Sequence, residues 1–276
     1  MNPHAALPVS LYSLVQGLWH NRKLILQMSR REVIGRYKGS VLGFLWSFLN
    51  PVFMLTVYTF VFSVVFKARW GVDGNDSKTQ FAVVLFVGMI VHGLFAEVVN
   101  RAPSLILANV NYVKKVIFPL EILPVIMMCA ALFHGLVSLA VLLIAFFIFN
   151  HSLQWTVIFI PLVLLPLVIL TLGCAWMLAS LGVFIRDVGQ TIGIVTTVMM
   201  FLSPVFFPVT SLPEVYRPLI MANPLTFIIE QAREVLIWGH LPDWIGLGIY
   251  AVVATVVAWV GYVWFQKTRK GFADVL

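Results

Sequence analysis

Long apolar stretches without charge divide this chain. Five stretches lack Asp, Glu, Lys and Arg, and they cover residues 39–66, 79–96, 122–185, 188–213 and 244–266. About 20 apolar residues in an α-helix cross the hydrocarbon core of a bilayer. Because lipid offers no hydrogen-bond partners, a crossing backbone must satisfy its own polar groups, as a helix does. With the longest stretch divided at Asn150 and His151, the pattern predicts an all-α polytopic membrane protein with six transmembrane helices.

Prolines make two of these spans irregular. Pro51 lies near the middle of the first span, where its missing N–H predicts a kink. The fifth span begins near Val188, and the sequence predicts that it breaks up at three later prolines, Pro204, Pro208 and Pro213. The expected spans are residues 41–66, 80–99, 122–149, 155–184, a fifth from 188 onward, and 244–266.

Residues 10–38 precede the first span and have a helical pattern of their own. Apolar residues recur there at helical spacing, at Leu11, Leu14, Val15 and Leu18, and a basic stretch follows them. An apolar stripe beside cations is typical of a helix that lies in the membrane interface. We therefore expect an N-terminal interfacial amphipathic helix over 10–38.

Two further segments fall between spans. Residues 102–121 are amphipathic and predicted to lie at the surface. In the segment 210–240, Asn223 and Pro224 predict a helix start and Gly239 predicts its end. That helix carries charges and has only about 15 residues, too few to cross a bilayer. It is expected to lie at the surface or to enter the membrane and return.

The composition leaves little material outside the membrane. The chain is 61% hydrophobic and only 11% charged, so residues 1–276 form a single transmembrane domain. The net charge of +7 is explained better by contact with anionic lipid than by nucleic acid. With six spans, 13 Lys and Arg fall on the side of both termini and 5 on the other. This bias predicts cytoplasmic N- and C-termini.

The chain lacks the motifs of an energy source. No G-x-x-x-x-G-K-[ST] phosphate loop is present. Proton- and ion-coupled carriers place an ionisable group at mid-membrane depth, whereas Glu97, the one carboxylate inside a predicted span, lies near an end. His92 and His134 are interpreted as packing residues, and no catalytic cluster or metal site is predicted. The residues thus indicate a transport subunit that another protein powers.

Three sequence strings point to a family. Residues 36–51 (RYKGSVLGFLWSFLNP), 114–119 (KKVIFP) and 222–236 (ANPLTFIIEQAREVL) resemble segments of type-2 ABC exporter permeases. The similarity is greatest to the branch that exports O-antigen and related lipid-linked polysaccharides, and it follows the same order along the chain.

The resemblance implies an assembly in the bacterial inner membrane. Two copies of this chain would form a homodimer, and two copies of a separate ABC ATPase would bind ATP and Mg, leaving no cofactor in this chain. The homodimer would enclose a channel for a glycan carried on undecaprenyl diphosphate. The interfacial helix would border lateral access for lipid, residues 102–121 would be the coupling helix, and 210–240 would be re-entrant helices at an external gate.

The resemblance also assigns roles to individual residues. The lipid diphosphate would meet Arg30, Arg31, Arg36 and Lys38, although these cations equally suit an anchor in bulk lipid. Coupling to the ATPase would involve Asn109, Asn111, Lys114, Lys115, Arg186 and Asp187. The glycan channel would use Trp46, Phe53, Tyr58, Phe201 and Phe206, and the external gate would use Asn223, Pro224, Glu230 and Arg233.

Three alternatives stay open at this point. Capsular polysaccharide or teichoic-acid export permeases share the same layout. A membrane-embedded polyprenyl-sugar transferase would need polar catalytic groups that converge at one membrane face. An ion-coupled carrier would need the mid-membrane carboxylate that the spans lack.

Overall fold

The computed structural model describes residues 9–65, 78–114 and 118–276, and within them it is helical without β-strands. Short 3-10 turns and two π-helical stretches, Thr59–Val65 and Glu234–Trp238, connect or extend the α-helices. The α-helices are α1 Leu11–His20, α2 Arg22–Tyr37, α3 Trp46–Tyr58, α4 Lys78–Arg101, α5 Val110–Lys114, α6 Leu123–Asn150, α7 Ile160–Phe184, α8 Val188–Phe201, α9 Arg217–Met221, α10 Pro224–Arg233, α11 Trp244–Thr268 and α12 Phe272–Val275.

Five helical segments among the described residues are long and apolar enough to cross a membrane. They are Gly43–Phe62, Gln80–Ser104, Leu120–Asn150, Trp155–Phe184 and Trp244–Val275. The fifth expected span is represented by α8, whose 14 residues rise only about 21 Å. As expected, α8 ends before the prolines that follow it. The protein is therefore a helical membrane protein, and its described residues include five helical segments of full spanning length and the shorter apolar helix α8.

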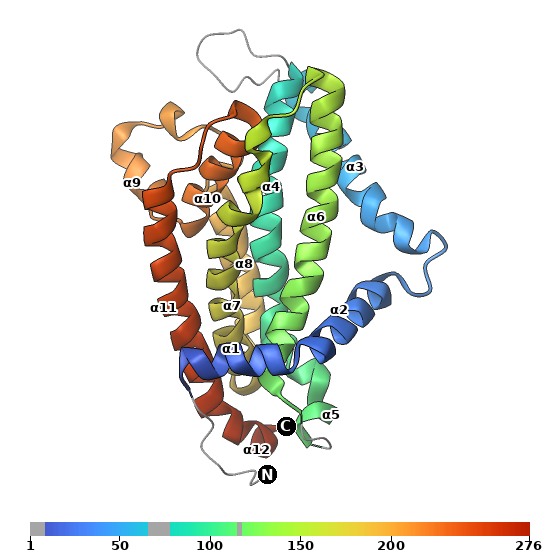
Figure 1. Cartoon of the computed structure of the whole chain (residues 1–276), viewed down its shortest axis with the longest axis vertical. Helices are drawn as coiled ribbons and strands as arrows, with labels where there is room; N and C mark the ends of the chain where they lie inside the picture. Colours follow the sequence, from blue (N-terminus) through green and yellow to red (C-terminus); the bar gives the residue numbers. More distant parts are fainter. Residues whose placement is uncertain (1–8, 66–77, 115–117) are drawn as a thin grey trace.

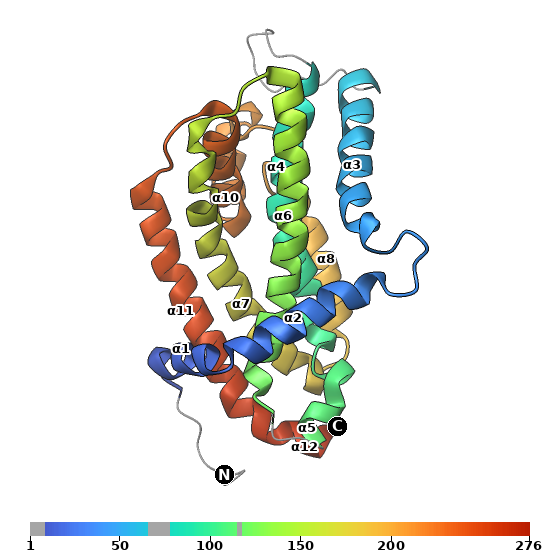
Figure 2. The same cartoon turned by 45° about the vertical axis from the view of Figure 1, so that its right-hand side comes forward.

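The spanning helices form a bundle with different elements at its two ends. α4, α6, α7 and α11 run side by side, and α4 is the central helix, with 72% of its apolar window buried against 11% in the α3 span (Figures 1 and 2). α5 and α12 lie at one end, here named the α5 end, and α1 and α2 lie across the bundle toward it. α9 and α10 lie toward the other end, named the α10 end.

The N-terminal segment differs from the expected single helix because it bends at Asn21. The Nδ2 group and the backbone N–H of Asn21 both donate to the carbonyl of Gly17, at 2.9 and 3.1 Å. An asparagine that bonds the preceding turn in this way competes with continued helix. α1 and α2 are consequently separate helices, each free to lie on the bundle at its own angle.

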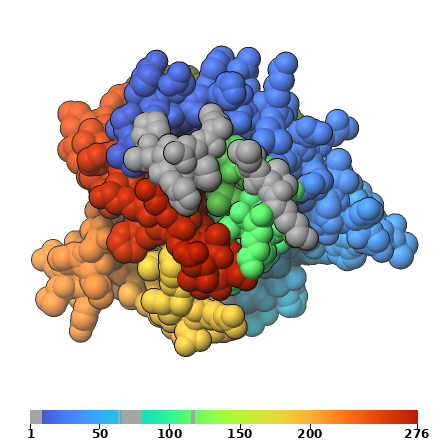
Figure 3. Space-filling view, turned by 90° about the horizontal axis from the view of Figure 1, so that it is seen from below, coloured from blue at the N-terminus to red at the C-terminus, as the bar shows by residue number. Residues whose placement is uncertain are grey.

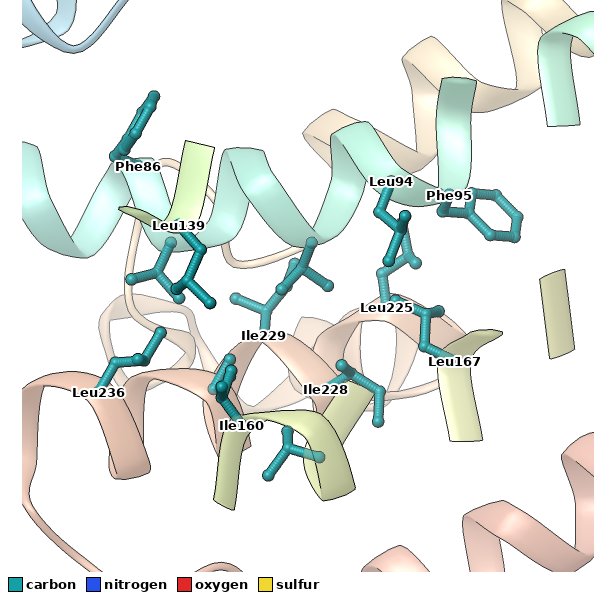
Figure 4. Close-up of a cluster of buried hydrophobic side chains, with 14 of the residues drawn as sticks. Phe86, Leu94, Phe95, Leu139, Ile160, Leu167, Leu225, Ile228, Ile229 and Leu236 are labelled. Atoms are coloured by element: carbon teal, nitrogen blue, oxygen red, sulfur yellow. The ribbon is translucent and has the colours of Figure 1, made fainter. Parts of the chain in front are cut away.

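α10 begins at the predicted Asn223 and Pro224, and its π-helical extension ends at the predicted Gly239. The Asn223 Oδ1 accepts from the N–H of Leu225 at 3.0 Å, while its Nδ2 donates to the carbonyls of Met199 and Leu202 at the end of α8. Gly239 ends the π-helical extension with φ +75°. Four residues at helical spacing fill the core between α4, α6 and α7 (Figure 4), namely Leu225, Ile228, Ile229 and Ala232. α10 is thus inserted into the bundle.

Two glycines allow α7 and α11 to touch backbone to backbone. A Cβ on Gly261 would lie 2.2 Å from the carbonyl oxygen of Gly173, and a Cβ on Gly173 would lie 2.7 Å from the backbone of Ala258. In lipid, apolar burial does not drive helices together, so close packing of small residues decides which helices associate. This contact therefore fixes α11, the last span, against the bundle.

The glycine contact predicts a selective loss of stability. Gly261→Ala should destabilise the protein by about 1–3 kcal/mol, because the added methyl group forces the two backbones apart. Gly248→Ala on the same helix is the matched control, since a Cβ there meets nothing within 4 Å. Thermal unfolding in detergent compares the two variants; equal midpoints would contradict the argument.

Candidate functional site

A cavity of about 330 Å³ lies where α2 turns into α3, against α4 and α6. Both polar and apolar side chains line it. α3 contributes Ser47, Asn50 and Tyr58, and α6 contributes His134 and Ser138 among apolar side chains of α4. Polar groups in a membrane domain line water-filled or substrate-bearing space far more often than lipid. This cavity is the strongest candidate site among the described residues.

Three ionisable side chains meet at the wall of the cavity. The Arg36 Nη1 lies 2.5 Å from the Glu97 Oε1 and 2.6 Å from the His134 Nδ1, and that Nδ1 lies 3.0 Å from the Glu97 Oε1. Because Arg36 can only donate, His134 Nδ1 either accepts from Arg36 or donates to Glu97, and its proton decides between them. The cluster joins α2, α4 and α6 through a bond network that has two arrangements.

A second ion pair repeats the contact one turn away. Arg101 of α4 pairs with Glu32 of α2 and lies 3.9 Å from the Glu97 Oε1. On α2 itself the only buried residue is Ser29. Charged contacts thus hold α2 on the bundle beside its partly buried apolar residues Leu24, Ile25 and Met28. An anion from outside can compete for the same arginines.

The four predicted headgroup cations have different surroundings. Arg36 is in the cluster, and the Arg31 Nη2 donates to the Tyr112 hydroxyl at 3.0 Å. Arg30 and Lys38 are exposed and have no partner among the described residues. The structure thus brings one of the four to the cavity and leaves two open to the membrane interface.

α1 adds an outward apolar face beside these cations. Tyr12, Val15 and Trp19 are 76%, 64% and 70% exposed, while Leu14 on the opposite face is buried. The guanidinium of Arg22 lies 4.7 Å from the Trp19 ring centroid, over its face. An exposed aromatic next to a cation is the pattern of a helix at the headgroup level of a bilayer.

The expected coupling helix is mostly a series of turns. In the described parts of this segment, 102–114 and 118–121, only Val110–Lys114 is α-helical, and the other elements there are short 3-10 turns. Pro103 and Pro119 lack N–H groups, and the Asn109 Nδ2 donates to the Leu105 carbonyl, so a long regular helix is disfavoured. Asn111 and Lys114 are exposed at the α5 end, whereas Lys115 lies outside the described residues.

The turn between α7 and α8 lies against the same segment. A Cβ on Gly182 would meet the Pro103 carbonyl oxygen at 2.0 Å, and one on Gly189 would lie 3.8 Å from the Pro103 ring. Arg186 and Asp187 lie between these glycines and are exposed. The turn that carries Arg186 and Asp187 is therefore a neighbour of the start of the predicted coupling segment, although the two are far apart in the sequence.

Three of the five predicted channel aromatics form a row of rings. The row also contains Phe62, which the sequence analysis did not single out. Phe206 stacks on Phe201 at 5.6 Å and on Phe62 at 6.0 Å, and Phe62 lies 6.5 Å from Tyr58. Phe62 thus bridges α3 to the segment after α8. Trp46 and Phe53 are further back on α3, where Trp46 is half-buried and Phe53 is 54% exposed.

Arg233 at the predicted external gate is a buried anchor. Its Nε donates to the Val84 carbonyl, its Nη2 to the Val205 carbonyl and its Nη1 to the Glu230 carboxylate, at 3.1, 3.2 and 2.9 Å. The side chain is 1% exposed. It joins α10 to α4 and to the segment after α8, so the gate region is fixed to the bundle by this residue.

The sequence analysis did not identify Glu97 and His134 as site residues, although the sequence around Glu97 gave one indication. Glu97 was the lone carboxylate in a predicted span, and a lone charge in a membrane requires a partner. The partner Arg36 is 61 residues away, and the pairing follows only from the fold. Within the described residues no group of three His, Cys, Asp or Glu side chains could hold a metal ion.

The known proteins to which this chain is similar are transporter subunits. Residues 23–237 match the family model described as ABC-2 type transporter. An O-antigen export system permease protein RfbA of Myxococcus xanthus is 30% identical over 95% of this chain and 98% of its own length. A Klebsiella pneumoniae protein of the same name is 26% identical over 92% and 95%. The Escherichia coli polysialic acid transport protein KpsM is 25% identical over 87% and 91%.

The Arg233 contacts predict a stability defect. Arg233→Met should lower stability by about 1–3 kcal/mol, because the Val84 and Val205 carbonyls lose a buried donor. Arg217→Met is the control at the same end of the bundle, since Arg217 is 40% exposed and water can replace its hydrogen bonds to the Leu212 and Thr210 carbonyls. Thermal unfolding and protease cleavage in the 202–243 segment measure the effect; identical behaviour of the two variants would be evidence against the anchor.

Proposed function

The chain belongs to the ABC-2 type transporter family, and we propose that it is the membrane permease of an ATP-driven exporter of lipid-linked polysaccharide. The observation that carries the proposal is the end-to-end match to an O-antigen export permease, 95% of this chain against 98% of that protein. The polymer is proposed to be O-antigen, carried on undecaprenyl diphosphate and moved outward across the bacterial inner membrane.

The proposed topology has six crossings. α8 enters the membrane from the α5 end, and residues 202–243 complete that crossing with re-entrant helices at the α10 end. The α5 end then lies in the cytoplasm with both termini, in agreement with the Lys and Arg bias. The large exposed apolar side chains of α3, α8 and α11 suit contact with lipid and with a second copy of the chain in a homodimer.

The lipid carrier is proposed to reach the protein along α1 and α2. Arg30 and Lys38 lie open at this interface and would attract the diphosphate first. Arg36 would then exchange the Glu97 carboxylate for a phosphate oxygen, since both are anions and both accept charge-assisted hydrogen bonds. Glu97 keeps Arg36 in place until the headgroup arrives.

The glycan is proposed to pass the aromatic row of Tyr58, Phe62, Phe206 and Phe201. Sugar rings present apolar C–H faces that pack on aromatic rings, and such contacts do not require one particular sugar. Trp46 and Phe53 would extend this surface along α3. Two ATPase subunits would bind at the α5 end through Asn109, Asn111, Lys114, Lys115, Arg186 and Asp187.

Capsular polysaccharide export is the second candidate, supported by the similarity to the polysialic acid transport protein KpsM. The higher identity and coverage of the O-antigen permease favour the first candidate. Deletion of the gene, followed by gel analysis of lipopolysaccharide and separate assay of capsule, distinguishes them. Loss of surface O-antigen with intact capsule is expected.

A first prediction concerns coupling. Lys114→Glu combined with Lys115→Glu should lower export at least about tenfold while the complex still hydrolyses ATP, because reversed charges at the contact surface disturb docking to the ATPase. Arg217→Glu, at the opposite end, is the control. Export measured with hydrolysis in reconstituted vesicles tests this; unchanged export by the double variant would remove the coupling assignment.

A second prediction concerns the headgroup. Arg36→Gln should weaken binding of farnesyl diphosphate, used as a short probe, by about tenfold, the size of a lost charge-assisted hydrogen bond. Glu97→Gln should strengthen it, because the guanidinium loses its internal competitor. Arg22→Gln on the same segment is the control. Binding to the purified permease is measured by calorimetry, with farnesyl monophosphate as the comparison; weaker binding by Glu97→Gln would refute the exchange.

A further inference from the structure

Residues 269–276, which follow α11, fold back under the bundle and are here called the tail. The tail consists of a 3-10 turn, Arg269–Gly271, and the short helix α12. In the structure it lies beside α5 and the end of α7 (Figures 1 and 2).

Phe272 anchors the tail in the bundle. Its side chain is fully buried, with ring centroids 5.6 Å from Phe265 and 5.9 Å from Phe184. The same buried cluster includes Ile106 and Ile122, at the two sides of α5. Phe272 is thus buried among side chains of α7, α11 and the coupling segment. This burial fixes the position of the tail relative to all three.

An ion pair provides a second anchor. The Arg269 Nη1 lies 2.8 Å from the Glu121 Oε2, and the two side chains are only 20% and 16% exposed. Glu121 is the residue at which the coupling segment enters α6, and its carbonyl oxygen accepts from the Trp176 indole at 2.9 Å. The tail is therefore bound to the end of the coupling segment as well as to its middle.

The outer face of the tail is open and continuous with the proposed coupling surface. Lys270, Ala273, Asp274 and Val275 are exposed. Seen from below, the tail lies between α5 and the turn after α7 (Figure 3). A partner that reaches both Lys114 and Arg186 must therefore cover the tail.

We propose that the tail is a third docking element for the ATPase, beside α5 and the Arg186–Asp187 turn, and that it transmits the partner's movement to α11. The proposal rests on the proposed function. The tail continues α11 without a loop, and the Ser180 and Thr268 hydroxyls, 2.6 Å apart, join α7 to α11 at the same end. A displacement of α12 is thus carried into the closely packed α7–α11 pair.

Cysteine protection tests the docking surface directly. In a background with Cys129→Ala and Cys174→Ala, single cysteines are placed at Asn111→Cys, Ala273→Cys and Glu214→Cys, and maleimide labelling is compared in the free permease and its ATPase complex. The first reports the coupling segment and the third, at the α10 end, is the control. Labelling at 273 should fall to about a tenth or less in the complex, as it does for side chains that an interface excludes from water.

The outcomes separate the inference from the proposed function. Protection at both 111 and 273 supports the tail as a docking element. Protection at 111 without protection at 273 overturns the inference and leaves the coupling segment in place. Absence of a co-purifying ATPase, or protection at neither position in a complex, overturns both.

A bulky substitution provides a functional check. Ala273→Trp should reduce the ATPase retained on the purified permease about tenfold, because an indole on the contact face keeps the two surfaces apart. Val215→Trp is the matched control, since Val215 is 84% exposed at the opposite end. Full retention by Ala273→Trp would argue against the tail.

Discussion

Polar groups buried in this helical bundle must find partners within the protein, and this constraint shapes the whole molecule. Water is absent there, so an unpaired donor or charge is strongly unfavourable. Arg233 accordingly reaches two carbonyls and a carboxylate from a 1% exposed position. The Thr196 hydroxyl donates to the Asn100 side chain at 2.9 Å between α8 and α4. Glu97 has Arg36, Arg101 and His134 around it.

The sequence predicted the parts of the fold that depend on local chemistry. The turn at Asn150 and His151, the limits of α10 and the end of α8 each follow from residues at the position itself. The break at Asn21 was not predicted, because it depends on bonds from the Asn21 side chain and backbone to the Gly17 carbonyl, which the apolar spacing does not report. The position of the tail was not predicted either, since burial of Phe272 depends on α7 and α11 meeting beneath the bundle.

For the site, the sequence provided residue types but not their partners. The basic run before the first span indicated an anion or a membrane surface, yet only the fold shows that Arg36 is already paired while Arg30 is open. In the sequence, Phe62 is indistinguishable from the other phenylalanines of the apolar spans. The structure shows Phe206, 144 positions further along the chain, stacked on its ring. Such pairings join residues that are far apart in the sequence, and the helical spacing of apolar residues does not predict them.

Two kinds of contact hold the elements of this bundle together, close backbone packing and ion pairs, and they differ in how easily they can be exchanged. α7 and α11 meet through glycine backbones, where a separation of even one methyl group loses the contact. α2 is held by partly buried apolar side chains and by ion pairs of arginines with carboxylates. In these pairs the arginine can exchange its carboxylate for another anion at similar free energy. The proposed function, in which a charged lipid is admitted and force is then transmitted, requires both kinds of contact. Exchangeable contacts lie at the proposed headgroup site on α2, and rigid ones lie between α7 and α11, the helices proposed to move as a unit.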